Sequence, residues 1–288
     1  MKLRFDPNRI PILVGATAVG KTVRSLQWAQ ENNGAILSAD SMQVYRRMDI
    51  GTAKVTLAER EKVPHFLVDI INPDEPWSLN HFLESARSIL DSHNNVLIVG
   101  GTGLYIRALI QGFRMPPSNA DPVLREQLYT RANVEGLLSL HQELSDIDPE
   151  SAKSIRPSDA FRIIRALEIF RHTGQKASQI RQQVPEPNRF QLVVLNRPRE
   201  VIYRNIETRV DEMIRLGLVD EVKSLLDAGY PPNLPALQGL GYKEIISYFQ
   251  GRISLVDAID LIKKRSRNFA KRQLTWYRSF SEAEWIEE

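Results

Sequence analysis

Short, continuous apolar runs alternate with amphipathic stretches over the first part of the chain. The runs lie at 11–16, 35–40, 66–71 and 95–101. Continuous apolar runs of this length are typical of strands that are buried on both faces, as in a parallel sheet. The clearest helical pattern covers 78–92, where apolar residues recur every three or four positions and Ser78 is placed to cap the start. This alternation predicts an α/β layered core.

The pattern changes after Phe113. Three prolines interrupt the stretch 115–122, and the sequence is then helical, with no strand candidate, to about Gln183. A second break precedes a strand-like run at 190–196, and the remaining stretch to 280 is helical. We therefore predict three parts: a first part of the α/β core at 1–114, an all-helical insertion at 115–188, and a completion of the core by one strand and C-terminal helices at 189–288.

The first apolar run leads directly into GATAVGKT, which fits the pattern Gly, four residues, Gly-Lys-Thr. In such a loop the backbone N–H groups converge on phosphate oxygens at a helix N-terminus, the lysine adds positive charge, and the Thr22 hydroxyl can bind Mg²⁺. The motif predicts a P-loop NTPase-like parallel sheet and, taken alone, favours bound ATP or GTP. The predicted phosphate-binding residues are Gly15, Ala16, Thr17, Ala18, Val19, Gly20, Lys21 and Thr22.

Residues that would support nucleotide hydrolysis are hard to find. A hydrolase of this class normally has a strand that ends in an aspartate near Mg²⁺, and a group that positions water. The strand predicted at 95–101 ends in Gly-Gly instead, and Asp69 follows another apolar run without a neighbouring glutamate. The phosphate site is therefore complete, whereas the hydrolytic site is not.

Asp40 closes the second predicted strand, so we expect it at the carboxyl edge of the sheet, beside the phosphate loop. A carboxylate there can bind Mg²⁺, accept a proton, or cap the next turn. Spacing alone leaves the capping and functional interpretations evenly balanced. Ser41 and Gln43 add polar groups at the same edge.

Arg209 interrupts an apolar stripe in the helical segment 199–216. It lies three residues after Ile206 and four before Met213. A charge in that position must be paired or must face a polar cavity, because burying it alone is costly. The alternatives are a buried salt bridge, a side chain that reaches the surface, or a clamp for an anion such as a diphosphate.

The overall charge does not indicate a nucleic-acid binder, because 38 basic and 35 acidic residues give a net charge of +3. Local segments differ: 263–278 has no acid and carries three aromatic residues, as an RNA backbone surface would, although packing into the core better explains the aromatic rings. Phe161 and Arg165 lie together away from the apolar stripe of their helix, so they can stack on unpaired bases. Core packing is the alternative for Phe161.

The 288-residue chain has no cysteine. Disulfides, cysteine-bound zinc and a thiol nucleophile are therefore excluded, and the composition suits a reducing compartment. No secretory signal is recognised, and no apolar run approaches the roughly 18 residues of a membrane span. We expect a cytoplasmic protein without a membrane partner.

Taken together, these segments resemble the bacterial tRNA dimethylallyltransferase family, also called tRNA isopentenyltransferases or IPP transferases. The resemblance covers nearly the whole chain. It is carried by GATAVGKT, SADSMQVYRRMDIGTAK, LIVGGTGLYIRAL, DAFRIIRALEIFRHTGQ, LQGLGYKE and RNFAKRQLTWYR, in that order. The family usually has Pro and Ser at positions 16 and 19, where this chain has Ala and Val. Its eukaryotic members carry a zinc finger, which a chain without cysteine cannot form.

The resemblance implies transfer of a dimethylallyl group from its diphosphate to N6 of the adenosine immediately 3′ of the tRNA anticodon. It implies a general base at Asp40, channel residues Thr17 and Thr102, a diphosphate held by the loop and Arg209, and Mg²⁺ as cofactor. The helical insertion would clamp the anticodon stem-loop, and we expect a monomer. The implied tRNA-binding residues are Asp40, Ser41, Met42, Gln43, Thr102, Arg125, Phe161, Arg162, Ile163, Ile164, Arg165, Gln238, Gly239, Leu240, Gly241, Tyr242 and Lys243.

Two other functions share part of this pattern. A small-molecule or nucleoside kinase using Mg-ATP has the loop and the core but needs no RNA surface. A non-catalytic, nucleotide-gated RNA-binding protein has no use for Asp40 and Arg209. One incubation with dimethylallyl diphosphate, Mg²⁺ and unmodified tRNA separates the three.

Overall fold

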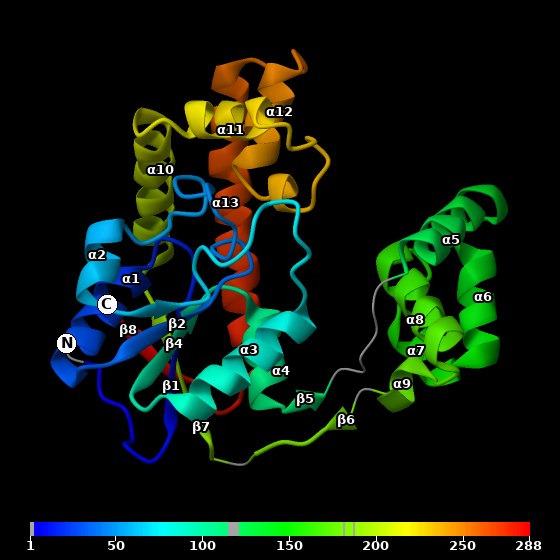
Figure 1. Ribbon diagram of the computed structural model, residues 1–288, viewed down its shortest axis with the longest axis horizontal. Coiled ribbons are helices and arrows are strands. Elements are labelled where there is room, and N and C mark those ends of the chain that lie inside the picture. Colours follow the sequence, from blue (N-terminus) through cyan, green and yellow to red (C-terminus); the bar gives the residue numbers. More distant parts are fainter. Residues whose placement is uncertain (1–2, 115–120, 181, 187) are drawn as a thin grey trace. The chain divides into compact units, whose positions relative to one another are not determined.

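The computed structural model describes residues 3–114, 121–180, 182–186 and 188–288, which form two compact units (Figure 1). Unit 1 comprises residues 1–108 and 187–288, and unit 2 comprises residues 109–186. The sequence placed the boundaries of the insertion at 115 and 188. Residue 115 lies outside the described residues, and residue 188 already belongs to unit 1.

Unit 1 contains a six-stranded parallel sheet with the order β3-β2-β4-β1-β7-β8. The strands are β1 (Ile10–Gly15), β2 (Ala35–Ala39), β3 (His65–Phe66), β4 (Val96–Gly100), β7 (Phe190–Asn196) and β8 (Glu284–Glu287). β1 pairs with β4 on one side and β7 on the other, so the phosphate loop leaves an inner strand. The strands predicted at 11–16, 35–40, 95–101 and 190–196 are confirmed.

Two predictions about strands were wrong. The run 66–71 does not form a strand beyond Phe66, because Leu67 and Asp69 have left-handed φ angles of 61° and 56° that break the extended backbone. The segment 189–288 was predicted to complete the core with one strand, but it supplies two, because β8 adds to the edge of the sheet beside β7. β8 has only half-buried and exposed residues, so its sequence lacks the apolar run that marked the inner strands.

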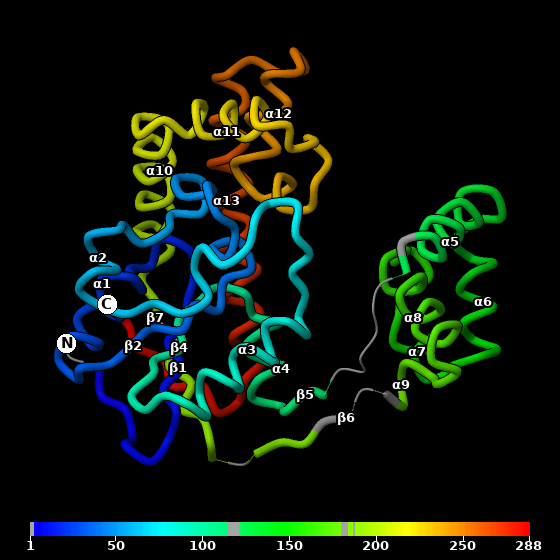
Figure 2. The backbone as a smooth tube through the Cα atoms, viewed as in Figure 1, coloured from blue at the N-terminus to red at the C-terminus, as the bar shows by residue number. Residues whose placement is uncertain are grey.

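The helices of unit 1 cover the sheet and extend beyond it. They are α1 (Lys21–Asn32), α2 (Leu57–Lys62), α3 (Leu79–Ser92), α4 (Gly103–Ile110, which crosses the unit boundary), α10 (Arg199–Arg215), α11 (Leu218–Asp227), α12 (Tyr242–Phe249) and α13 (Leu255–Tyr277), with a short 3₁₀ helix η1 (Ala236–Gln238). Helix α3 confirms the helical prediction, and the Ser78 hydroxyl accepts from the His81 N–H at its start. Figure 2 shows α10 and α13 side by side, with α11 and α12 across their ends. Ile202, Ile206 and Ala270 attach this helical group to the sheet core.

Unit 2 is a small helical body with its own core. Its elements are β5 (Phe113–Arg114), α5 (Pro122–Glu135), α6 (Leu137–Ile147), α7 (Pro149–Ser154), α8 (Ala160–Thr173), α9 (Ala177–Ile180) and β6 (Gln182–Gln183). β5 and β6 pair in antiparallel fashion at the two ends of the unit, a strand pair that the helical pattern did not predict. Side chains of α5, α6 and α8 form one buried apolar cluster, which includes Leu128, Leu144 and Leu167.

Candidate functional site

The phosphate loop lines a cavity at the N-terminus of α1. Gly20, which precedes α1, has a φ of 107°, and Ala18 has a φ of 62°. No side chain caps the N-terminus of α1. A Cβ at Gly15 would lie 2.4 Å from the Leu195 carbonyl oxygen of β7, so only glycine fits where the loop leaves the sheet. The helix end is therefore free to bind an anion.

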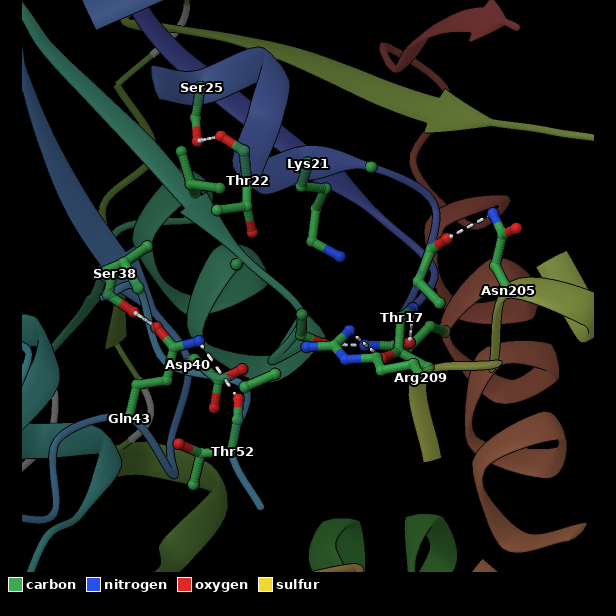
Figure 3. A pocket seen from close by; sticks show the side chains of 18 of the residues that line it. Thr17, Lys21, Thr22, Ser25, Ser38, Asp40, Gln43, Thr52, Asn205 and Arg209 are labelled. Carbon is green, nitrogen blue, oxygen red and sulfur yellow. Dashed lines mark hydrogen bonds between the residues drawn. The ribbon is translucent and has the colours of Figure 1, made fainter. Parts of the chain in front are cut away.

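Lys21 is the first residue of α1, at the end of this loop, and its side chain projects into the cavity (Figure 3). Its ammonium group donates to the carbonyl oxygens of Gly15 (3.0 Å) and Ala16 (2.9 Å). An ammonium has three N–H donors, so one remains for a ligand. The pKa of Lys21 is lowered to about 8, mainly by burial and also by the charge of Arg209, while the charge of Asp40 partly offsets both effects. The loop thus carries a cation whose charge is destabilised until an anion binds.

Three side chains from α10 and α13 hold the loop in place. The Asn205 amide donates to the Ala18 carbonyl oxygen (3.1 Å), and the Arg209 guanidinium donates to Thr17 Oγ1 (3.3 Å). The Gln273 carbonyl oxygen accepts from the Thr17 N–H (2.8 Å). Asn205 and Gln273 were missed by the sequence analysis.

Gln273 also explains the Gly-Gly pair at the end of β4. Its amide nitrogen donates to the Gly101 carbonyl oxygen (2.9 Å), and a Cβ at Gly101 would lie 2.5 Å from that nitrogen. The space beside β4 is thus filled by a neutral amide from α13. Asp69 does not replace the missing acid either, because it forms ion pairs with Lys54 (2.5 Å) and Arg60 (2.6 Å).

Asp40 both caps a turn and lines the cavity. Its Oδ1 accepts from the Met42 N–H (2.9 Å), while Thr102 Oγ1 accepts from the Ser41 N–H (3.0 Å). These bonds fix the backbone after β2, so the Asp40 carboxylate lies beside the cavity, as Figure 3 shows. The two interpretations of Asp40 left open by the sequence are therefore compatible.

Arg209 is not part of a buried salt bridge within the described ranges, since no carboxylate there lies within 4.0 Å of its guanidinium. Burial lowers the pKa of Arg209, and the charge of Asp40 partly offsets that effect. Its side chain extends from α10 into the cavity near Thr17 (Figure 3). This arrangement supports the anion-clamp interpretation over the two structural alternatives.

Two cavities meet at this point of unit 1. The first has a volume of about 580 Å³ and contains the phosphate loop, including Lys21 and Thr22. The second has a volume of about 300 Å³ and contains Thr102 together with parts of α12 and α13. The residues that line both cavities are Thr17, Asp40, Thr52, Arg209 and Phe269. A ligand in each cavity would therefore meet the other beside a carboxylate and a guanidinium.

Most of the RNA-binding residues predicted in unit 1 line the second cavity. These are Asp40, Ser41, Met42, Thr102, Leu240, Gly241, Tyr242 and Lys243. Gln43 lines the first cavity instead, where it accepts from the Ser38 hydroxyl (3.1 Å). Gln238 donates to the Pro232 carbonyl oxygen, and a Cβ at Gly239 would lie 2.5 Å from the Met42 side chain. These last two residues support the wall of the cavity.

The predicted RNA-binding residues of unit 2 differ strongly in exposure. Phe161 is 66% exposed, and Arg162 is exposed and forms an ion pair with Asp159. Ile163 and Ile164 are 0% and 1% exposed, so the prediction that they contact RNA is wrong for their side chains. Both belong to the apolar core of the unit.

Arg125 and Arg165 of unit 2 share one buried partner. Arg125 donates to both carboxylate oxygens of Glu168 (2.9 Å each), and Arg165 donates to one of them (2.9 Å). Glu168 is 1% exposed. Its carboxylate therefore fixes both arginines at the unit surface, which keeps them partly exposed and ordered.

The donors in the first cavity suit a Mg²⁺ ion that arrives with a phosphate ligand. Among the residues that the structure describes, no group of three or more His, Asp or Glu side chains could hold a metal ion. The cavity offers the exposed Thr22 hydroxyl, the Ser38 hydroxyl and the Asp40 carboxylate. Mg²⁺ commonly takes one or two protein oxygens and completes its shell with phosphate and water, so these residues fit it.

Comparisons with known proteins show which family the chain is similar to. A family model described as IPP transferase matches residues 43–280, and one described as isopentenyl transferase matches residues 8–69. The tRNA dimethylallyltransferase of Geobacter metallireducens is 45% identical, over 98% of this chain and 93% of its own. That of Pelotomaculum thermopropionicum is 42% identical, over 98% and 92%.

Solved structures give the same result. A tRNA isopentenylpyrophosphate transferase from Bacillus halodurans has a TM-score of 0.70 and 40% identity, covering 97% of this chain and 90% of that one. A eukaryotic dimethylallyltransferase, described as acting on tRNA, has a TM-score of 0.80 and 25% identity, covering 97% of this chain and 74% of that one.

Within the described part of this chain, no helix combines the length and the apolar character that a membrane span requires.

Proposed function

This chain belongs to the IPP transferase family, and we propose that it transfers a dimethylallyl group from dimethylallyl diphosphate to N6 of the adenosine immediately 3′ of the tRNA anticodon. The observation that carries the proposal is the pair of cavities that meet at Asp40 and Arg209. A one-substrate hydrolase needs only the phosphate cavity. A transferase needs a second cavity for the acceptor, with a proton acceptor at the junction.

The first cavity binds the diphosphate in this proposal. The uncapped N-terminus of α1, the remaining N–H of Lys21 and the Arg209 guanidinium border the cavity where negative charge grows as the C1–O bond breaks. Donors that are already in position stabilise such charge most effectively, because they need no reorganisation. When Mg²⁺ is bound, the Thr22 hydroxyl supplies one of its ligands and the ion neutralises part of the charge on the diphosphate.

The second cavity receives the adenine, which must leave its stack to enter. N6 of the adenine attacks C1 of the prenyl donor, the C1–O bond breaks, and one N6 proton must leave as the N6–C1 bond forms. The Asp40 carboxylate lines both cavities, so it is placed to accept that proton. Proton transfer to a positioned base typically contributes about 10²–10⁴-fold to a rate.

Thr17 and Thr102 position the reacting groups. Thr17 connects the phosphate loop to Arg209 through its hydroxyl and to Gln273 through its N–H. Thr102 holds the turn after Asp40 through the Ser41 N–H. Each therefore orients a group that the reaction uses, Arg209 in one case and Asp40 in the other.

Unit 2 would bind the anticodon stem-loop. The exposed Phe161 ring and the neighbouring Arg162 offer a stacking face and a phosphate contact, and Glu168 holds Arg125 and Arg165 in place. Ile163 and Ile164 are left out of this contact set. The proposal includes a monomeric enzyme, and an enzyme that modifies tRNA would act in the cytoplasm.

Incubation of the full chain with dimethylallyl diphosphate, Mg²⁺ and unmodified tRNA tests the proposal, with nucleoside analysis after digestion. We expect N6-isopentenyladenosine, and its amount should depend on both the donor and the protein. A kinase using Mg-ATP is not favoured by the relatives. Consumption of ATP on a small acceptor, with no modified nucleoside, would overturn the transferase proposal.

A further inference from the structure

We propose that Glu221 is a positioning residue of the acceptor cavity, because it ties the backbone turn at 49–51 to Tyr242 and so fixes two walls of that cavity against each other. The inference rests on the proposed function, and it assigns to α11 a role in placing the tRNA adenosine. Glu221 itself lines neither of the two cavities.

The Glu221 carboxylate makes four hydrogen bonds to two separate parts of the chain. Oε2 accepts from the N–H groups of Asp49 (2.8 Å) and Ile50 (2.7 Å). Oε1 accepts from the Gly51 N–H (3.0 Å) and from the Tyr242 hydroxyl (2.7 Å). An ionised carboxylate has about four lone-pair sites, so its capacity is fully used.

The two segments that Glu221 joins are neighbouring parts of the wall of the second cavity. Gly51 and Thr52 belong to the loop that follows Asp40, and Gly241 and Tyr242 begin α12; all four line that cavity. The walls also touch directly, because a Cβ at Gly51 would lie 2.4 Å from the Tyr242 ring. The width of the cavity thus depends on how closely the Tyr242 ring packs against the 49–51 turn.

The loop after Asp40 needs an external support of this kind. Arg47 and Ala53 have left-handed φ angles of 65° and 48°, which are unfavourable for residues with a side chain. Inside the loop, the ammonium of Lys54 donates to the Tyr45 carbonyl oxygen (2.7 Å) and to Asp49 Oδ1 (2.6 Å). The N–H groups of residues 49–51 point the other way, toward Glu221, so this carboxylate completes the restraint from outside.

Glu221→Gln is the direct test. The amide keeps one acceptor oxygen but presents an NH₂ group to the other donors, so at least one of the two clamped segments is released. We expect kcat/KM for tRNA to fall by about 10- to 100-fold, the size of effect that a misplacement of about 1 Å produces. The dissociation constant of dimethylallyl diphosphate with Mg²⁺ should stay within about twofold of wild type, because Glu221 has no contact with the phosphate loop.

Asp220→Asn is the matched control, because it removes the same charge from the neighbouring, exposed position of α11 and should leave kcat/KM unchanged. Gly51→Ala perturbs the same contact from the other side without altering Glu221. It should reproduce the selective loss of kcat/KM for tRNA, since its Cβ displaces the Tyr242 ring.

Wild-type kcat/KM in Glu221→Gln would overturn the inference. So would a loss of donor affinity equal to the loss in kcat/KM, because that pattern would indicate general damage to the fold. The same measurements distinguish failure of the proposed function from failure of the role assigned to Glu221. If the wild-type protein forms no isopentenyladenosine, the proposed function is wrong, whatever the variants do.

Discussion

Raising the pH from 7 to 9 should weaken the binding of dimethylallyl diphosphate by about tenfold, because Lys21 loses its proton in the free protein over this range. Burial is the main cause that lowers the pKa of Lys21 from its usual 10.5 to about 8, followed by the charge of Arg209. A bound diphosphate reverses the effect of both, since it places negative charge beside the ammonium. Binding and protonation of Lys21 are therefore coupled.

The size of this loss of affinity follows from the pKa of Lys21 in the free protein and in the donor-bound protein. If the donor restores the pKa to its usual 10.5, the dissociation constant scales with (1 + 10^(pH − 8))/(1 + 10^(pH − 10.5)). This factor is about 1.1 at pH 7 and about 11 at pH 9. The pKa of the bound state is the higher one, so affinity is greatest at low pH and is lost as the pH rises through 8. Proton uptake per donor bound rises from about 0.1 at pH 7 to about 0.9 at pH 9.

Calorimetric titration measures both quantities. An unreactive thio-diphosphate analogue of the donor is titrated with Mg²⁺ at pH 7, 8 and 9, in buffers with different ionisation enthalpies. The matched variant is Lys21→Met. It should bind the analogue weakly, and its affinity should change between pH 7 and 9 only through the protonation of the analogue and of the water bound to Mg²⁺. An affinity for the wild-type protein that stays flat over this range would refute the coupling.

Two further predictions concern carboxylates. Asp40→Asn keeps an acceptor for the Met42 N–H, so donor binding should persist, whereas the single-turnover rate with tRNA should fall by about 10²–10⁴-fold; an unchanged rate would remove Asp40 from the role of base. Glu168→Gln should destabilise unit 2 by about 2 kcal/mol, seen as faster hydrogen exchange in α5 and α8, because Arg125 and Arg165 lose their buried partner. Burial raises the pKa of Glu168 but the two arginines lower it more, so in wild type this stabilisation is present above about pH 4.5 and lost on further acidification.

The sequence predicted the inner strands well and the edges of the sheet poorly. β1, β4 and β7 are buried on both faces, so burial alone produces an apolar run that can be recognised. The run at 66–71 is also apolar, but only Leu67 and Val68 in it are buried, and an apolar run does not determine φ. Left-handed φ angles at Leu67 and Asp69 keep the chain from continuing β3 beyond Phe66. β8 pairs on one side only and carries Glu284 and Glu287, so it has no apolar signal.

A site residue was easier to identify from the sequence when burial of its side chain costs more free energy. Arg209 stood out because a charge within an apolar stripe requires an explanation. Gln273 interrupts the buried face of α13 in the same way, between Ala270 and Tyr277, but a neutral amide in a stripe attracts less notice. Glu221 gave no signal at all, because its backbone donors lie about 170 positions earlier in the chain. Ile163 and Ile164 show the opposite error, since matching a whole segment to a family includes its core positions.

The position of the carboxylates determines what a phosphate loop can catalyse. Asp69 is neutralised by Lys54 and Arg60, and Gln273 fills the space beside β4, so neither place offers a base for a water next to the phosphates. Asp40 is the carboxylate that remains at the junction of the two cavities. In the proposed function, its reaction partner is whatever nucleophile fills the second cavity. A planar base held between the walls that Glu221 joins would exclude water from that position, so the choice between alkyl transfer and hydrolysis depends on how well the acceptor cavity is formed.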